Sequence, residues 1–90
     1  MREVALQAMI PATLLARRAF YALGRKTVYT NSYNDCHTVK AYRTGNGGDV
    51  EIKSSIVKLL QDNGYKGITS HLTNDPSNYR RGAIIIRIPK

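Results

Sequence analysis

The chain has 90 residues, a formal net charge of +8 and one cysteine. This length supports a single hydrophobic core, and one cysteine excludes an internal disulfide. No apolar run reaches the roughly 18 residues that cross a bilayer, and the positive charge excludes a mimic of the DNA surface. We therefore expect one domain over residues 1–90, a cytoplasmic location, no membrane segment and an anionic partner.

The N-terminal quarter of the chain predicts helical structure. Residues 2–10 form a short apolar lead-in, interpreted as a helical appendage, and Pro11 suits the first turn of a helix. A second helix is expected over residues 12–23, with Gly24 as its stop. Its expected apolar side consists of Leu15, Ala19, Ala22 and Leu23. The sequence leaves open whether residues 2–23 form one kinked helix or two.

Two strands are expected next, over residues 26–32 and 37–44, because both are rich in β-branched and aromatic residues. The polar residues 33–36 between them predict a hairpin turn. In the second strand, alternation places Val39 and Ala41 toward the core. The opposite set, Thr38, Lys40 and Tyr42, then faces solvent or a ligand.

The clearest pattern is an amphipathic helix that begins after a glycine-rich turn at Asp49 and ends before Gly64. Asp49 is expected to cap its first turn, and glycine adopts the left-handed conformation that ends helices. The apolar stripe of this helix consists of Ile52, Ile56, Leu59 and Leu60.

The C-terminal part predicts two more strands, over residues 65–72 and 83–88, separated by a loop over residues 73–82. In the last strand Ile85 lies opposite Ile84, Ile86 and Ile88, which indicates a strand inside the sheet and not at its edge. The predicted fold class is α+β, with the order α-β-β-α-β-β and an antiparallel sheet that has helices on one face.

Tyrosines and cations are interleaved along the chain. Bases stack on aromatic rings while cations hold phosphates, and this combination binds nucleic acid without reading its sequence. The candidate binding residues are Lys40, Tyr42 and Arg43 on the hairpin, Tyr79, Arg80 and Arg81 in the last loop, and Arg17 and Arg18 as a second patch. Some of the tyrosines are expected to cover the edge of the core instead.

Catalytic signals are weaker. Cys36 and His37 are adjacent, but structural zinc sites need four ligands, so no metal and no cofactor are expected. His71 lies on a predicted strand just before the loop with Arg80 and Arg81. A histidine and an arginine together supply the base and the cation of ribonuclease chemistry. An ordinary strand histidine is the alternative.

Two parts of the chain resemble known families. The run from Lys53 to Tyr65, the pair Ser70-His71 and the closing Ile86-Arg87-Ile88-Pro89-Lys90 look like the core of HicA-type toxins. Those are ribonucleases with a double-stranded-RNA-binding-like fold, and the resemblance covers about the last two-fifths of the chain. It implies His71 as the catalytic residue. The glycine that usually precedes the Ser-His pair in that family is absent here.

The second resemblance covers residues 12–65 and rests on the run from Thr30 to Tyr42. It is similar to small domains of polyvalent proteins that phages and conjugative elements encode, and it implies a mobile-element setting in a host cytoplasm.

The sequence therefore favours a non-enzymatic phage or mobile-element protein that binds DNA or RNA through a basic, tyrosine-containing surface. One alternative is an inhibitor of a nucleic-acid-bound host protein complex, of the anti-defence or anti-CRISPR type. The other is a HicA-like ribonuclease. An exposed strand or the apolar N-terminal segment could also pair two copies of the chain.

Overall fold

The computed structural model describes residues 11–43, 48–73 and 82–90 of the chain. These residues form two helices and four strands in the predicted order α-β-β-α-β-β, so the α+β prediction is confirmed. The elements are α2 (Ala12–Ala22), β1 (Val28–Ser32), β2 (Cys36–Tyr42), α3 (Asp49–Asp62), β3 (Thr69–Thr73) and β4 (Ala83–Pro89). The predicted appendage over residues 2–10, and with it the choice between one N-terminal helix and two, lies outside the described residues.

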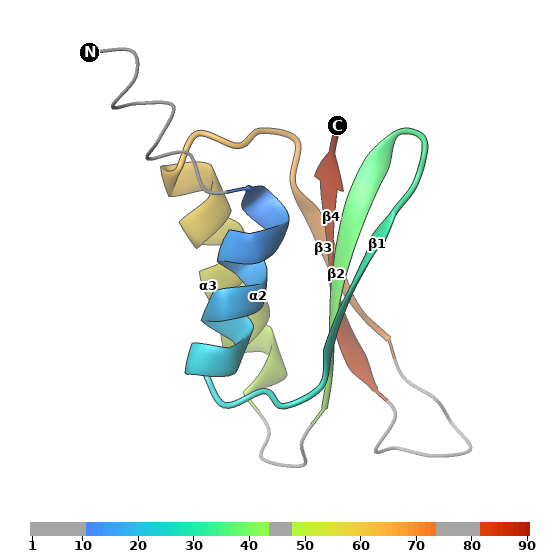
Figure 1. Cartoon of the computed structure of the whole chain (residues 1–90). Coiled ribbons are helices and arrows are strands. Elements are labelled where there is room, and N and C mark those ends of the chain that lie inside the picture. Colours follow the sequence, from blue (N-terminus) through green and yellow to red (C-terminus); the bar gives the residue numbers. More distant parts are fainter. Residues whose placement is uncertain (1–10, 44–47, 74–81) are drawn as a thin grey trace.

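The strands form one sheet in the order β1-β2-β4-β3, and each neighbouring pair is antiparallel. Both helices lie on the same face of this sheet, and no described element covers the other face (Figure 1). The start of α2 and the C terminus lie at the same end of the molecule (Figure 1). If these two ends were joined and the chain were opened before β4 instead, the order of elements would be β-α-β-β-α-β, which is that of a ferredoxin-like fold. The arrangement is therefore a circular permutation of that fold's order.

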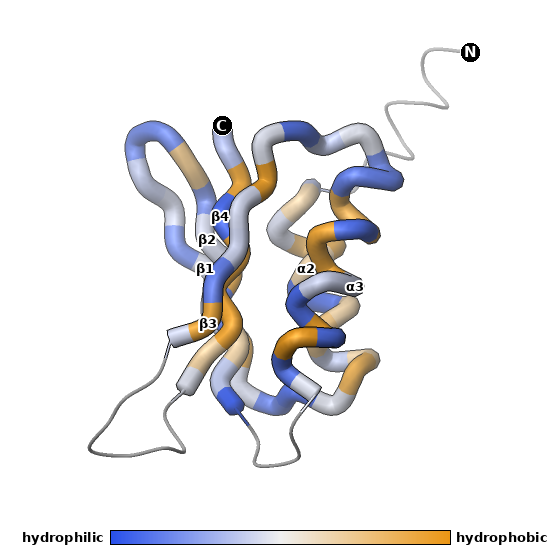
Figure 2. Tube along the Cα trace, turned by 180° about the vertical axis from the view of Figure 1, so that it is seen from behind, coloured by the Kyte–Doolittle hydropathy of each residue, from blue (hydrophilic) through white to orange (hydrophobic). Residues whose placement is uncertain are grey.

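The core lies between the helices and the inner face of the sheet. The central strand β4 contributes Ile84, Ile86 and Ile88, and β2 contributes Val39 and Ala41, as alternation predicts. The helices close this layer with Ala12, Ala16, Phe20, Ile56 and Leu60. Hydrophobic residues are concentrated along β4 and the facing turns of both helices (Figure 2). The interior position of β4 confirms the inference drawn from its isoleucines.

The predicted apolar side of the first helix is partly wrong. Ala16 and Phe20 are fully buried, whereas Ala22 is exposed and Leu23 is 46% exposed. Leu15 and Ala19 do pack against the core at its margin. Because apolar residues cover more than half of the circumference of this helix, its sequence allows either of two overlapping apolar stripes to face the core. The small residues on the buried stripe let the helix approach the sheet closely, and the phenyl ring of Phe20 fills the remaining space.

The predicted capping role of Asp49 is also wrong. The N-cap of α3 is Gly48, in the left-handed conformation at φ +77°, and no side chain caps the helix. The Asp49 carboxylate instead accepts hydrogen bonds from Arg25 and from Arg43, the latter at 2.8 Å. Both arginines lie on segments that meet the start of α3, and two charge-assisted bonds outcompete a cap on a backbone amide.

Candidate nucleic-acid interface

The face of the sheet opposite the helices carries a row of side chains that crosses all four strands. Tyr29 on β1 pairs with Lys40 on β2, Lys40 with Ile85 on β4, and Ile85 with His71 on β3. Directly paired residues in an antiparallel sheet project from the same face. The alternating residues of β2 and β4 fill the core on the helix side. The row therefore faces away from the helices, on what we call the open face.

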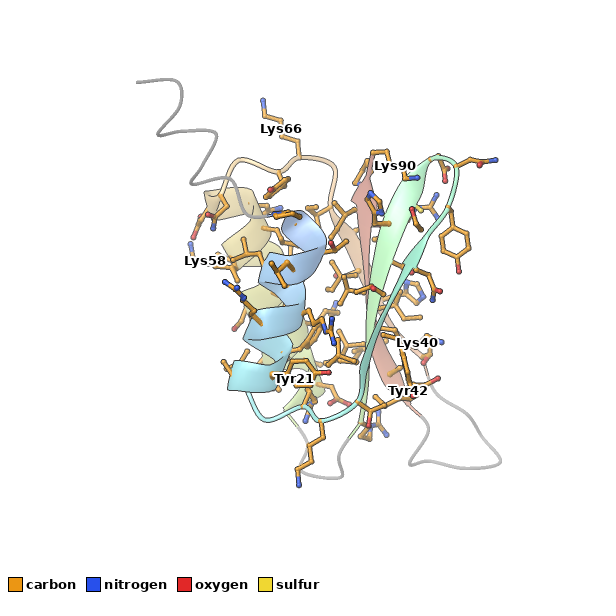
Figure 3. All side chains as sticks on the ribbon, viewed as in Figure 1. Tyr21, Lys40, Tyr42, Lys58, Lys66 and Lys90 are labelled. Atoms are coloured by element: carbon orange, nitrogen blue, oxygen red, sulfur yellow. The ribbon has the colours of Figure 1, made fainter. Side chains whose placement is uncertain are left out.

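At one end of this row two tyrosines and a lysine make direct contact. The rings of Tyr29 and Tyr42 meet edge to face, with centroids 5.8 Å apart and planes at 83°. The Lys40 ammonium group lies 5.4 Å from the centroid of the Tyr42 ring, within range of a cation–π interaction. Tyr29 is 54% exposed, and Lys40 and Tyr42 extend from the side of the sheet away from the helices (Figure 3). We call these three residues the tyrosine cluster.

A second row on the open face ends in an ion pair. Thr38 on β2 pairs with Arg87 on β4, and the Arg87 guanidinium lies 3.0 Å from Asp35 in the hairpin turn. Cys36 sits beside this pair and is 2% exposed. Burial raises the pKa of the Cys36 thiol, and its hydrogen bond to Asp35 raises the pKa further. This end of the open face thus holds the thiol of Cys36, whose raised pKa makes it a poor nucleophile, and Arg87, which is already paired with Asp35.

The structure brings together only part of the predicted binding set. Lys40 and Tyr42 lie side by side in the tyrosine cluster. Arg43, the next residue, leaves the open face, because its Nε donates to Asp49 at 2.8 Å and its side chain is 27% exposed. A Cβ atom on Gly82 would lie 2.9 Å from Arg43 Cζ, so the guanidinium also packs on the backbone. Arg43 therefore has a structural role at the start of α3.

Arg17 and Arg18 lie on α2, in the helical layer, and so on the other side of the molecule from the open face. Both are exposed, and Arg17 lies 5.8 Å from the centroid of the Tyr21 ring. They form a surface separate from the open face, and their binding role stays a prediction. Tyr79, Arg80 and Arg81 lie outside the described residues.

The described cations do not gather on one surface. Arg87 and Lys58 each pair with a carboxylate, and Arg25 and Arg43 share Asp49. The cations for which the described part of the chain supplies no carboxylate partner lie on the helices, on the connecting segments and on the sheet: Arg17, Arg18, Lys26, Lys40, Lys53, Lys66 and Lys90. Figure 3 shows this spread, with Lys40 by the sheet and Lys58 and Lys66 by the helices. The distribution of the described cations therefore does not by itself mark out an interface.

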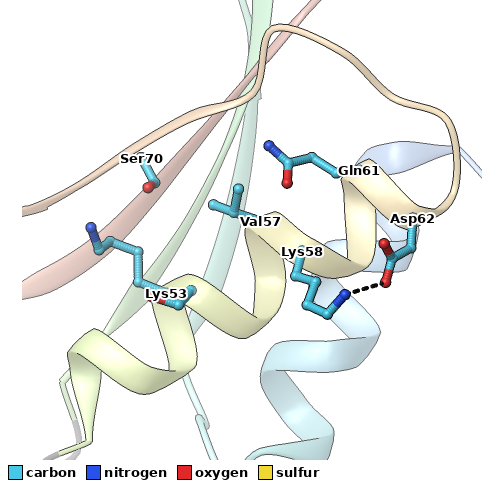
Figure 4. Close-up of a pocket in the computed structure, with 7 residues that line it drawn as sticks. Lys53, Val57, Lys58, Gln61, Asp62 and Ser70 are labelled. Carbon is cyan, nitrogen blue, oxygen red and sulfur yellow. Dashed lines mark hydrogen bonds and ion pairs between the residues drawn. The ribbon is translucent and has the colours of Figure 1, made fainter.

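An open depression of about 410 Å³ lies between α3 and β3, on the helix side of the sheet. It is lined by Lys53, Val57, Lys58, Gln61 and Ser70, among others. In Figure 4 the Lys53 ammonium group extends from α3 toward the strand that carries Ser70, while Lys58 turns to Asp62. Among the described residues, the lining of this depression holds no aromatic ring, so it offers no surface for base stacking.

His71 is exposed at the far end of the row from Tyr29. Within the described part of the chain, no side chain donates to or accepts from its imidazole ring, whereas catalytic bases are usually oriented by a third group. Sequence reasoning did not select Tyr29 or Ile85 as site residues. The period-two alternation of β1 and β4 would have placed both on the open face once the strand register was known.

Comparisons with family models, with curated proteins and with solved structures find no match to this chain. Among the described residues, no helix has both the length and the apolar character that a membrane span requires.

Proposed function

We propose that this chain is a non-enzymatic protein that binds single-stranded nucleic acid across the open face of its sheet. Two bases stack on the rings of Tyr29 and Tyr42, and Lys40 holds the phosphate between them. The observation that carries the proposal is the tyrosine cluster, in which the Tyr42 ring lies 5.8 Å from the exposed Tyr29 ring and 5.4 Å from the Lys40 ammonium group, on a sheet face that no described element covers.

The geometry of the cluster favours unpaired bases over a duplex. Tyrosine rings offer π-faces to bases only when those bases are unstacked and splayed from a strand. Among the described residues, the open face also has no projecting helix or ribbon that could enter a major groove. Four-stranded sheets with helices on one face are used in this way by RRM domains, whose aromatic residues stack two or three bases. That parallel is one of architecture alone.

The distribution of charge fits weak, non-specific recognition. Among the described residues, the cations that can contact phosphates near the cluster are Lys40 and, once it exchanges Asp35 for a phosphate, Arg87. Stacking then contributes most of the binding free energy, at about 1–3 kcal/mol per base. DNA and RNA share this chemistry. The resemblance of residues 12–65 to mobile-element domains remains a prediction, and it is what favours a phage-encoded protein in a host cytoplasm.

The test is a titration of fluorescently labelled poly-dT and poly-U oligonucleotides with the full chain, followed by anisotropy. We expect Tyr29→Ala and Tyr42→Ala each to weaken binding about tenfold or more, the equivalent of the stacking loss. Tyr21→Ala is the matched control, because Tyr21 is also an exposed tyrosine in contact with a cation, but on α2. Equal losses from Tyr21→Ala and Tyr42→Ala would overturn the assignment to the open face.

The exposed side of α2 favours a second candidate function, inhibition of a nucleic-acid-bound host protein complex. Leu14 is 36% and Tyr21 43% exposed, and Arg17 lies between them on the same helical face. Tyrosine and arginine are enriched among the residues that dominate protein–protein binding energy. Affinity capture from host lysate with and without nuclease separates the candidates. A protein partner retained after nuclease treatment and lost in Tyr21→Ala would favour the inhibitor.

A further inference from the structure

Strand β1 is an edge strand with an unusually bare outer side. Among the described strands it pairs only with β2, and its residues Val28–Ser32 are exposed except for Val28. Natural edge strands are commonly protected from pairing with other chains by a charged residue, a proline or a bulge. The five residues of β1 carry no charge and no proline, and the register with β2 runs without interruption. Within the described part of the chain, β1 thus lacks these three protections.

The hydrogen bonds that flank β1 show which backbone groups face outward. Tyr42 N–H donates to Thr27 C=O at 3.0 Å, and Tyr33 N–H donates to Cys36 C=O at 2.8 Å. In an antiparallel pair the bonded positions alternate with unbonded ones. Counting from Thr27, the residues bonded to β2 are the odd-numbered ones, so Val28, Thr30 and Ser32 direct their N–H and C=O groups to solvent.

The other edge of the sheet is better protected. Of the strands that the structure describes, β3 pairs only with β4, and by the same alternation it presents the backbone groups of Ser70 and Leu72 outward. Lys53 extends from α3 to this side (Figure 4), and a lysine beside an edge strand is a common obstacle to strand addition. A partner strand therefore finds more free backbone groups and no cation at β1.

We propose that two copies of this chain join through their β1 strands, antiparallel, with Thr30 on the twofold axis. This register pairs Thr30 with Thr30 of the second copy and Val28 with Ser32 of the second copy. It uses all the outward groups and forms roughly six hydrogen bonds between the chains. The partner strand is the β1 strand of a second copy, because a strand that pairs antiparallel with its own copy forms a closed dimer with twofold symmetry. β1 is also uncharged, which keeps like charges out of the seam.

In the dimer, the nucleic-acid interface extends over both copies, a consequence that rests on the proposed function. The two sheets become one sheet of eight strands with a continuous open face. Tyr29 lies on the strand at the seam, so the two tyrosine clusters become neighbours across it. A single strand of nucleic acid that crosses the seam contacts both clusters, whereas one copy alone accommodates roughly three nucleotides.

The experiment is sedimentation velocity of the full chain over a roughly hundredfold range of concentration, in enough salt to screen the net charge. We expect a monomer–dimer equilibrium for the natural chain. Thr30→Lys and Thr30→Glu should each be monomeric, because like charges meet at the axis, and an equal mixture of the two should restore a dimer. Thr69→Lys, on the other edge strand, should leave the equilibrium unchanged.

Thr30→Pro gives a second test, since it removes an outward N–H and spares the bonds to β2; we expect it also to be monomeric with the circular dichroism of the natural chain. A natural chain that stays monomeric, or a dimer that survives Thr30→Lys and Thr30→Glu, would overturn the inference. A dimer that meets these expectations but binds no oligonucleotide would support the β1 seam and overturn the proposed function instead. The two ideas therefore fail separately.

Discussion

Arg25 and Asp49 form a buried ion pair between residues that lie 24 positions apart in the chain. Their side chains are 2% and 10% exposed, respectively. The second oxygen of Asp49 is held by Arg43. One carboxylate thereby joins the segment after α2, the end of β2 and the start of α3, which fixes how the first hairpin sits against the helices.

Removing that carboxylate tests its role. Asp49→Ala removes the carboxylate that pairs with the buried Arg25 guanidinium and with Arg43, and we expect a loss of about 3–5 kcal/mol in the free energy of unfolding. Urea denaturation followed by circular dichroism measures it. Asp62→Ala breaks the exposed pair with Lys58 and serves as the control, with an expected change of about 0–1 kcal/mol. Similar losses for the two variants would show that burial does not decide the strength of these pairs.

Much of the fold could be predicted from the sequence, because short-range patterns determine it. Alternation placed Val39 and Ala41 in the core, and the three isoleucines on one side of β4, with Ile85 opposite, placed that strand inside the sheet. Helix ends followed from glycine, since Gly24 and Gly64 adopt φ values of +92° and +90° just beyond the helices. The order of elements needed no long-range information.

The candidate site was less predictable, because it depends on register between distant strands. Lys40 and Tyr42 are neighbours on one strand and could be paired from sequence alone. Tyr29 joins them only through the β1–β2 register, and His71 joins the row only through two further strands. The role of Arg43 was hidden for a different reason: Asp49 lies only six residues further along the chain, but no sequence pattern indicates that the two side chains meet.

The salt dependence of binding reports the phosphate contacts of the tyrosine cluster. We expect Lys40→Gln to lower the slope of log K against log salt concentration by about one, because one counterion fewer is released. Anisotropy titrations at several salt concentrations measure the slope. Lys66→Gln, which changes an exposed lysine between α3 and β3, should leave the slope within error of the natural value. Equal changes in the two variants would mean that charge acts diffusely and not at the open face.

Cys36 should resist alkylation. Its thiol is buried, and both burial and the hydrogen bond to Asp35 raise its pKa. Thiolate is the reactive form, so iodoacetamide at pH 8 should label the folded chain far more slowly than the chain in urea, with mass spectrometry as the readout. Because the pKa of this thiol is higher in the folded chain than in the unfolded chain, the neutral thiol stabilises the fold at pH values below the unfolded pKa. This contribution to the free energy of unfolding is lost as the pH rises from the unfolded pKa through the folded pKa. Equal labelling rates for folded and unfolded chains would contradict the burial of Cys36.

His71 separates a binding protein from a ribonuclease. We expect the natural chain to leave a labelled single-stranded RNA intact, because no side chain among the described residues orients the imidazole ring and the nearest member of its row is the apolar Ile85. We expect His71→Ala to weaken oligonucleotide binding less than Tyr42→Ala does, since His71 lies two strands away from the tyrosine cluster. Denaturing gels follow the RNA, and mass spectrometry detects any 2′,3′-cyclic phosphate. Cleavage by the natural chain that disappears in His71→Ala would establish the ribonuclease instead, and the open face would then be its substrate-binding surface.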